Sequence, residues 1–489
     1  MIPTLIEECL RMILFECSAN GEGELGGCTP SDFPLVAEMT AAQLDLMVAA
    51  TEGKASNVED IYPLTPLQEG MLFHSLLDKH SQEYVPQLKW MIDVDQFDVQ
   101  RMKKAWMKLM ERHAVFRTRF EWTQTKTAVQ VVQRRVALPW IEVQWTSDAL
   151  LEEYLEADRR RGFEMNQAPL MRLHLINVGT KEHIFVWTIH HILLDGWSMA
   201  MVLQELLTYY ESDGGVQLPP TPAYREYVAW IQQQDSEMAE EYWRRQMKGF
   251  ESPTPVPFLK QATSGGGGTP SRRAITMTAA ETSKVVKYAR EHNLTVHTLL
   301  QAAWGVVLSA HSGELDVVFG TTSSGRSAAS NVINNLEKMV GMLITTTPTR
   351  LLVNREEPVV WWLKKVQERQ IETQQYEWLP LATIQAMSDV SDGCALFETL
   401  FVFGNHPMVR EVLENTSSPF GEFDSFEMTN VPLAVDISIH AGHLEVALLF
   451  HSNRISGVDI ESKLSQLVNV VLSIPSAKFV GELRLAAKE

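Results

Sequence analysis

Residues 184–198 read IFVWTIHHILLDGWS, and this stretch decides how the chain is interpreted. It opens with an apolar run rich in β-branched and aromatic residues, which is short enough to be a buried strand. The run ends in His190 and His191, and Asp195 follows one tight turn later. We therefore expect a titratable imidazole at the end of a rigid strand with a carboxylate nearby, which is an arrangement typical of a site.

A helix is predicted directly after this turn. Gly196 allows the chain to bend, and Ser198 can cap the apolar helical pattern that runs from Met199 to Leu207. The neighbouring 200 residues also mix helical and strand patterns. This mixture favours an α/β or α+β layer architecture.

The composition argues against some partners. The 489 residues are 45% hydrophobic and 21% charged, which gives an ordinary globular protein enough apolar material for a core. The formal net charge of −19 opposes binding to phosphate backbones, and the basic residues occur as short clusters rather than as a track. We therefore expect no nucleic-acid partner.

Cysteine use and hydropathy indicate the compartment. Four cysteines are too few for a disulfide framework, and Cys9, Cys17 and Cys28 lack the CxxC spacing of a zinc site. Charged residues interrupt the first 17 residues, so a signal peptide is not expected. No run approaches the roughly 18 apolar residues of a membrane helix. These features predict a reduced, soluble, cytoplasmic protein with no membrane partner.

Composition shifts divide the chain into an N-terminal appendage (1–57), an N-terminal lobe (58–258), a linker (259–273) and a C-terminal lobe (274–489). Gly265 to Gly268 are consecutive glycines, which cannot form a rigid element and mark the strongest boundary. The two lobes have similar mixtures of helices and strands, although no repeat is visible. They therefore suggest a pseudo-duplicate.

Hydrophobic periodicity predicts helices over residues 3–17, 40–50, 66–76, 99–113, 150–161, 281–292, 298–311, 359–376 and 460–474. It predicts strands over residues 115–122, 128–132, 170–178, 316–321, 343–349 and 400–403, and a hairpin from residues 433–439 and 444–450. Thr65 is expected to cap the helix that Pro66 begins.

HHILLDG (190–196) resembles the HHxxxDG motif of the condensation domains of non-ribosomal peptide synthetases. Further phrases match this family in order, namely YPLTPLQEGMLFH (62–74), RHAVFRTRF (112–120), YREYVAW (224–230) and VGMLITTTP (340–348). Phe116 replaces a usual leucine. Thr346 stands where asparagine is usual, so no substrate contact is carried over to that position. The resemblance covers about residues 58–485.

The resemblance implies a mixed α/β (α+β) fold built as a two-lobed pseudo-dimer of chloramphenicol acetyltransferase-like lobes, with an active-site tunnel at their interface. TPSDFPL (29–35) is similar to the tail found where an epimerisation domain joins a following condensation domain. The opening YPLTPLQEGMLFHSL (62–76) resembles condensation domains that take a D-configured donor. The chain is thus expected to be a fragment of a longer synthetase, with epimerisation and adenylation domains as neighbours.

The implied reaction is acyl transfer from a thioester to an amine, which forms a peptide bond. Both substrates would be carried on the 4′-phosphopantetheine arms of donor and acceptor peptidyl carrier proteins, and the chain itself would bind no cofactor. His191 matches the catalytic residue of the family. An imidazole with a pKa of about 6.5 suits proton removal near neutrality. The alternative, in which His191 only orients the amine, stays open.

The resemblance also implies residues that support the site. His190 is expected on the opposite face of the strand, packed and hydrogen-bonded. Asp195 either orients the imidazole or forms a structural ion pair, and the family pattern favours a pair with Arg326, in the phrase GTTSSGR (320–326). Gly196 is either a turn glycine or a position where a Cβ would obstruct the site.

Rival functions differ in their sequence requirements. A metal site at His190 and His191 is disfavoured because adjacent strand side chains diverge. An epimerisation domain would carry a glutamate in a phrase resembling EGHGRE, where this chain has TSSGR (322–326). A stand-alone acyltransferase using coenzyme A or carrier thioesters is an alternative. A non-catalytic recruitment module typically loses the second histidine, which is present here.

Overall fold

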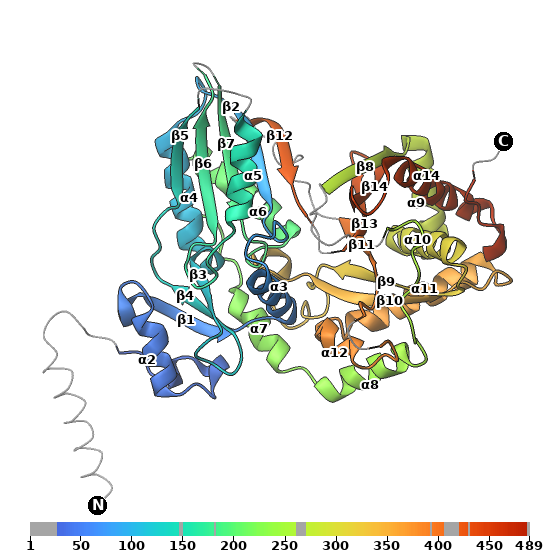
Figure 1. Ribbon diagram of the computed structural model, residues 1–489, viewed down its shortest axis with the longest axis horizontal. Helices are drawn as coiled ribbons and strands as arrows, with labels where there is room; N and C mark the ends of the chain where they lie inside the picture. Colours follow the sequence, from blue (N-terminus) through green and yellow to red (C-terminus); the bar gives the residue numbers. More distant parts are fainter. Residues whose placement is uncertain are drawn as a thin grey trace, which may run out of the picture.

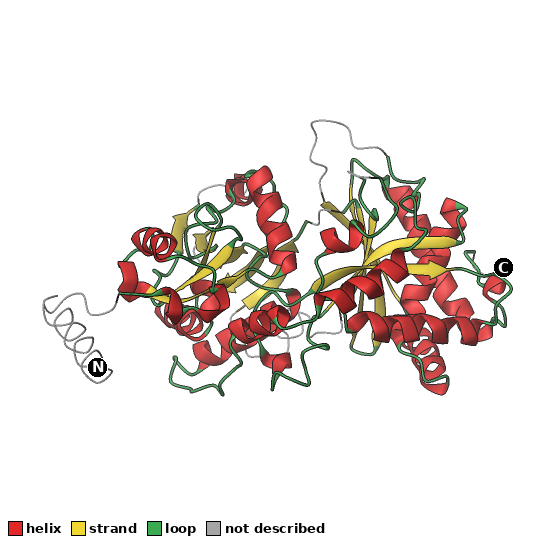
Figure 2. Cartoon of the chain, turned by 90° about the horizontal axis from the view of Figure 1, so that it is seen from below, coloured by secondary structure: helices red, strands yellow, loops and turns green. Residues whose placement is uncertain are grey.

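A computed structural model describes residues 27–145, 150–179, 182–260, 270–391, 394–404, 420–428 and 431–486. The predicted helix over residues 3–17 and the four glycines lie outside these ranges. Two lobes, each built around a β-sheet with helices packed on it, lie side by side (Figures 1 and 2). The structure is thus of the mixed α/β class that the sequence predicted.

The strands of the first half are β1 (Val58–Pro63), β2 (Gln87–Asp93), β3 (Thr118–Glu121), β4 (Val129–Gln133), β5 (Trp140–Gln144), β6 (Met171–Asn177) and β7 (Glu182–Ile189). Its helices are α2 (Ala41–Ala49), α3 (Pro66–Leu77), α4 (Val99–Arg112), α5 (Leu151–Arg161), α6 (Gly196–Glu211), α7 (Tyr224–Gln232) and α8 (Ser236–Met247).

The strands of the second half are β8 (Pro270–Thr276), β9 (Asp316–Ser323), β10 (Thr345–Leu352), β11 (Thr399–Gly404), β12 (Phe420–Phe426), β13 (Leu433–His440) and β14 (His443–His451). Its helices are α9 (Ala279–Glu291), α10 (Val296–Ser312), α11 (Val359–Gln374), α12 (Leu381–Gln385) and α14 (Gly457–Ser473).

The sheet of the N-terminal lobe has the strand order β12-β2-β7-β6-β5. Side chains of β7 alternate between its faces, as the period of a strand requires. Phe185 and Trp187 join the large core that includes residues of α4 and α6, whereas Ile184 and Val186 join a smaller cluster with Leu155 of α5. Both faces of β7 are therefore covered, which explains its nearly continuous apolar sequence.

The sheet of the C-terminal lobe has the order β10-β9-β11-β13-β14-β8. Its core draws on α9, α10, α11 and α14. β13 and β14 form the predicted antiparallel hairpin, which turns at Ala441 and Gly442 with both φ angles in the left-handed region. β8 begins at Pro270, so this sheet starts inside the stretch assigned to the linker from composition.

Strand β12 connects the two lobes. It follows β11 of the C-terminal sheet in the chain but pairs antiparallel with β2 at the edge of the N-terminal sheet. Figure 1 shows it (orange) beside the strands of the other lobe. The main core likewise contains residues of both halves, such as Trp187 and Leu343. The lobes are therefore joined by backbone pairing and by a shared apolar interior.

The residues before the first lobe pack on a separate three-stranded sheet of order β1-β4-β3. In the phrase TPSDFPL, Thr29 and Asp32 close a short turn, and Phe33 is buried against Leu44 and Met47 of α2. The Gln232 side chain of α7 donates to the carbonyl of Leu35 at 3.0 Å. This segment is therefore anchored to the first lobe.

Two local predictions were wrong. Residues 115–122 are not one strand, because a 3₁₀ turn occupies Ala114–Arg117 before β3 begins. The cap of α6 is Asp195 rather than Ser198, since the Asp195 carboxylate accepts the backbone N–H of Ser198 at 2.7 Å and the helix already starts at Gly196. A carboxylate at this position also interacts favourably with the helix dipole.

Candidate active site

The turn after β7 carries the two histidines and is held by backbone bonds to both sides. The N–H of His190 donates to the carbonyl of Leu170 at 2.9 Å, and that of His191 donates to the carbonyl of Tyr84 at 2.7 Å. The Gln68 side chain of α3 donates to the carbonyl of Ile192 at 2.9 Å. The turn is thus fixed on the end of a buried strand, as a pre-organised site requires.

The His191 ring has a defined tautomer. Its Nδ1 lies 2.6 Å from the carbonyl oxygen of Leu194, which can only accept a hydrogen bond, so Nδ1 carries a proton and donates it. The lone pair of a neutral ring is therefore on Nε2. The His191 side chain is 13% exposed, and its Nε2 lies 3.4 Å from Oε1 of Glu427, which directly follows β12. The imidazole therefore lies where the two halves of the chain meet.

Glu427 is the residue that sequence reasoning missed. Burial lowers the pKa of His191, but the neighbouring carboxylate of Glu427 raises it, and the net pKa lies above the ordinary value. No local motif marks this glutamate. Its place beside His191 depends on the pairing of β12 with β2, which brings distant parts of the chain together.

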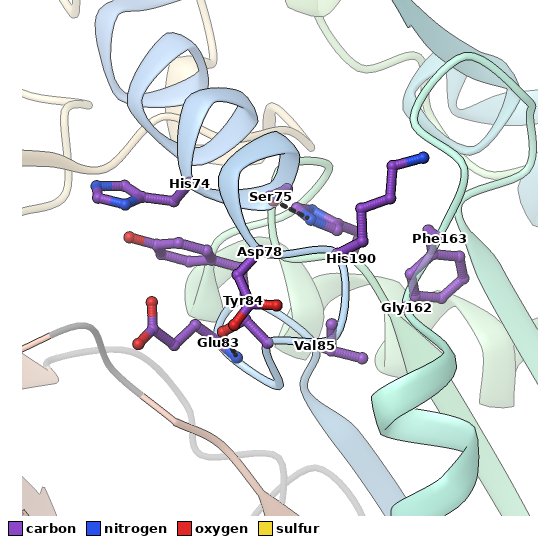
Figure 3. Close-up of a pocket in the computed structure, with 11 residues that line it drawn as sticks. His74, Ser75, Asp78, Glu83, Tyr84, Val85, Gly162, Phe163 and His190 are labelled. Carbon is purple, nitrogen blue, oxygen red and sulfur yellow. Dashed lines mark hydrogen bonds between the residues drawn. The ribbon is translucent and has the colours of Figure 1, made fainter. Parts of the chain in front are cut away.

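His190 faces the other side of the turn. Its Nδ1 accepts the N–H of Ile192, so its Nε2–H donates to Oγ of Ser75 at 2.9 Å. Both residues line a small cavity, which Figure 3 shows together with His74 and Tyr84. Burial lowers the pKa of His190 to about 3, so this ring is neutral near pH 7. The geometry gives His190 a packed, hydrogen-bonded environment.

Asp195 points away from His191 and toward the C-terminal lobe. Its carboxylate lies 2.8 Å and 3.2 Å from the two terminal nitrogens of Arg326 and accepts the N–H of Leu343 at 3.1 Å. The side chain of Asp195 is fully buried, and that of Arg326 is 6% exposed. Burial raises the pKa of Asp195, but the charge of Arg326 lowers it below its ordinary value. The carbonyl of Leu194, and not this carboxylate, orients the imidazole.

The family phrases from distant parts of the sequence converge around this ion pair. Arg326 also donates to Ser198 Oγ and to the carbonyl of Met339, and the hydroxyl of Tyr224 donates to the carbonyl of Met342. Gly341 is so close to Tyr224 that an added Cβ would overlap its ring. The turn, α6 and the segment before β10 therefore form one rigid unit across the lobes.

Gly196 is the first residue of α6, and its φ angle is not in the left-handed region. Any need for glycine there therefore arises from space rather than from backbone conformation. The phrase RHAVFRTRF also supports α6, since Arg112 and His113 both contact the carboxylate of Glu205, at 3.1 Å and 2.6 Å. This phrase holds the scaffold and does not contact His191.

Within the described ranges, no group of three or more His, Cys, Asp or Glu side chains is arranged to hold a metal ion. No helix in that part of the chain has both the length and the apolarity to cross a membrane. The small cavity beside His190 is not lined by His191. A tunnel that reaches His191 from two sides stays a prediction.

Solved structures define the class of fold. The chain superposes on a four-domain non-ribosomal peptide synthetase, holo-AB3403, with a TM-score of 0.72 and 17% identity, covering 88% of this chain and 34% of that one. It superposes on the condensation domain of the monacolin K polyketide synthase MokA with a TM-score of 0.70 and 16% identity, covering 88% of this chain and 100% of that one. The fold is the two-lobed, chloramphenicol acetyltransferase-like fold that the resemblance implied.

Sequence comparison gives the family. The profile of the condensation domain matches residues 58–480, and the chain belongs to that family. It is 38% identical over 479 residues to one of the linear gramicidin synthase proteins of Brevibacillus parabrevis, and 28% identical over 503 residues to bacitracin synthase 1 of Bacillus licheniformis. These alignments cover 96% and 99% of this chain but 6% and 9% of the relatives. The chain therefore spans less than a tenth of each of these two proteins.

Proposed function

We propose that this condensation domain forms a peptide bond between a donor aminoacyl or peptidyl thioester and the amine of an acceptor aminoacyl thioester. Both substrates are carried on phosphopantetheine arms of separate carrier proteins. The observation that carries the proposal is the geometry of His191, whose Nδ1 is occupied by the Leu194 carbonyl while Nε2 faces the junction of the lobes. A lone pair fixed in this direction suits proton transfer at one defined point.

The proton and bond changes balance without a cofactor. The acceptor ammonium gives one proton to Nε2 of His191, and the neutral amine attacks the carbonyl carbon of the thioester. The carbon–sulfur bond breaks, and the amide nitrogen loses its second proton. The departing sulfur takes up one proton and the solvent receives the other. Because thioesters are already reactive, positioning supplies much of the rate.

Each remaining candidate residue has a supporting role in this proposal. His190 and Ser75 pack one side of the turn. Asp195 and Arg326 join the turn to the C-terminal lobe. Gly196 keeps the start of α6 free of a side chain.

The proposal extends to the molecular context. The phrases TPSDFPL and YPLTPLQEGMLFHSL support a D-configured donor and an upstream epimerisation domain, with an adenylation domain also nearby. The partners are donor and acceptor peptidyl carrier proteins, and the location is cytoplasmic. The stand-alone acyltransferase and the recruitment module are the alternatives that the following experiment separates.

The experiment mixes the chain with a loaded donor carrier and a loaded acceptor carrier and follows the dipeptidyl acceptor carrier by intact mass. We expect product with the wild type and with His183→Ala, a matched control on the far end of β7, and none with His191→Ala. Wild-type rates with His191→Ala would remove His191 from the mechanism. His191→Asn keeps hydrogen-bonding atoms but cannot take the proton, so full activity there would indicate an orienting role only.

The donor configuration is tested with the same assay. Donor carriers loaded separately with the D- and L-epimers are compared, and the D-epimer is expected to react faster. Equal rates would contradict the D-donor assignment. Carrier binding without any product in the wild type would favour the recruitment module.

A further inference from the structure

Glu427 reaches His191 because of how β12 is paired. Phe426, the last residue of β12, lies opposite Gln87 of β2, which in turn lies opposite Thr188 of β7. Successive residues of β12 therefore end level with the point where β7 gives way to the two histidines. The ring of Phe426 is held under the guanidinium of Arg159 at 4.0 Å. The backbone at Glu427 is thus placed by the sheet of the opposite lobe.

The contact between Glu427 and His191 has a defined chemical direction. Since Nδ1 of His191 donates to Leu194, Nε2 is the nitrogen that faces the carboxylate, at 3.4 Å. A carboxylate this close favours a proton on Nε2 and hence the imidazolium form. The neighbouring His190 is buried and neutral, so it does not supply the partner charge.

This arrangement conflicts with the proton transfer proposed for His191. An imidazolium has no lone pair on Nε2 and cannot accept a proton from the amine. The site therefore needs an event that removes the proton from Nε2 before the reaction. The acceptor substrate brings a cation of its own, because an α-ammonium carries a full charge and three N–H donors.

We propose that Glu427 is the receptor for the α-ammonium group of the acceptor substrate, and that this ammonium replaces the His191 imidazolium as the partner of the carboxylate. The inference rests on the proposed function and assigns the residue that recognises the amine. When the ammonium binds Glu427, the proton on Nε2 leaves to solvent. The ammonium then donates one N–H to Oε1 of Glu427 and another to the freed Nε2 lone pair, along which its proton is transferred.

A binding experiment tests the recognition step without requiring turnover. Its probes are glycyl-aminopantetheine, an unreactive amide with a free ammonium, and acetyl-aminopantetheine, which lacks that group. We expect the wild type to bind the glycyl probe about tenfold more tightly, because one charge-assisted contact at a half-exposed site is gained. Glu427→Gln should bind both probes equally.

Asp424→Asn is the matched control. Asp424 lies on the same strand, and its carboxylate pairs with Lys89 at 3.2 Å. This variant should keep the preference for the glycyl probe. Equal affinity of the wild type for the two probes, or an unchanged preference in Glu427→Gln, would overturn the proposal.

A titration of the His191 ring by NMR tests the exchange step. In Glu427→Gln the ring should titrate at lower pH than in the wild type, and addition of the glycyl probe to the wild type should deprotonate Nε2 at constant pH. A titration that is the same in both proteins would refute the exchange. Since neither measurement depends on dipeptide formation, failure of this inference is distinguishable from failure of the proposed function.

Discussion

The pair formed by Asp195 and Arg326 allows a sharp prediction about stability. Asp195→Ala leaves the guanidinium of Arg326 buried, with Ser198 and carbonyl groups as its remaining partners. Removing one partner of a buried ion pair costs about 3–5 kcal/mol. The same change removes the cap of α6, which costs about 1 kcal/mol more. We therefore expect a loss of about 4–6 kcal/mol.

The assay is urea unfolding followed by tryptophan fluorescence, with Asp195→Ala, Arg326→Met and the double variant compared in one cycle. Because the cost arises mainly from the unpaired charge, the double variant should be less destabilised than the sum of the single variants. Asp424→Asn, which removes an exposed carboxylate, should lose less than about 1 kcal/mol. A loss below about 1 kcal/mol in Asp195→Ala, or strict additivity in the cycle, would refute the reasoning.

Three further predictions concern the same region. Because the folded pKa of Asp195 is lowered, its stabilisation is fully present above the unfolded pKa of about 3.9 and is lost as the pH falls through the folded value, so Asp195→Asn should flatten this part of an acid-unfolding curve. Ser75→Ala should cost about 1–3 kcal/mol in urea unfolding by leaving the buried His190 Nε2–H without its partner, and an unchanged midpoint would contradict that tautomer. Gly325→Ala should lower the melting temperature strongly, because φ is +65° and the new Cβ would overlap the Leu343 carbonyl oxygen. Gly442→Ala has the same kind of φ with open space around it, so an equal loss in both variants would contradict the steric argument.

Elements with strong local signals could be predicted from the sequence. The Thr65-Pro66 start of α3 carries its own cap, and the N–H of Thr65 donates to Oε1 of Gln68 at 3.0 Å. β7 was predictable because both of its faces are buried and its sequence is therefore uniformly apolar. The contact between Asp195 and Arg326 followed from the family pattern, since no local feature links residues so distant in the chain.

β12 could not be found in this way. Its sequence, FGEFDSF, places phenylalanine at every third position rather than at alternate positions, because the register against β2 shifts between Phe420 and Phe423. Without the period of two there is no strand signal. The importance of Glu427 was hidden for the same reason, as its neighbourhood is created by long-range pairing.

The loan of β12 from one lobe to the other has a consequence for building hybrid synthetases. A cut at the glycine run would give the first fragment a sheet whose edge strand, β2, presents unpaired backbone groups, and such edges invite aggregation. An exchange of the second fragment between synthetases would also import a foreign residue at position 427. Recombination that keeps β2 and β12 from the same parent preserves both the sheet edge and the carboxylate.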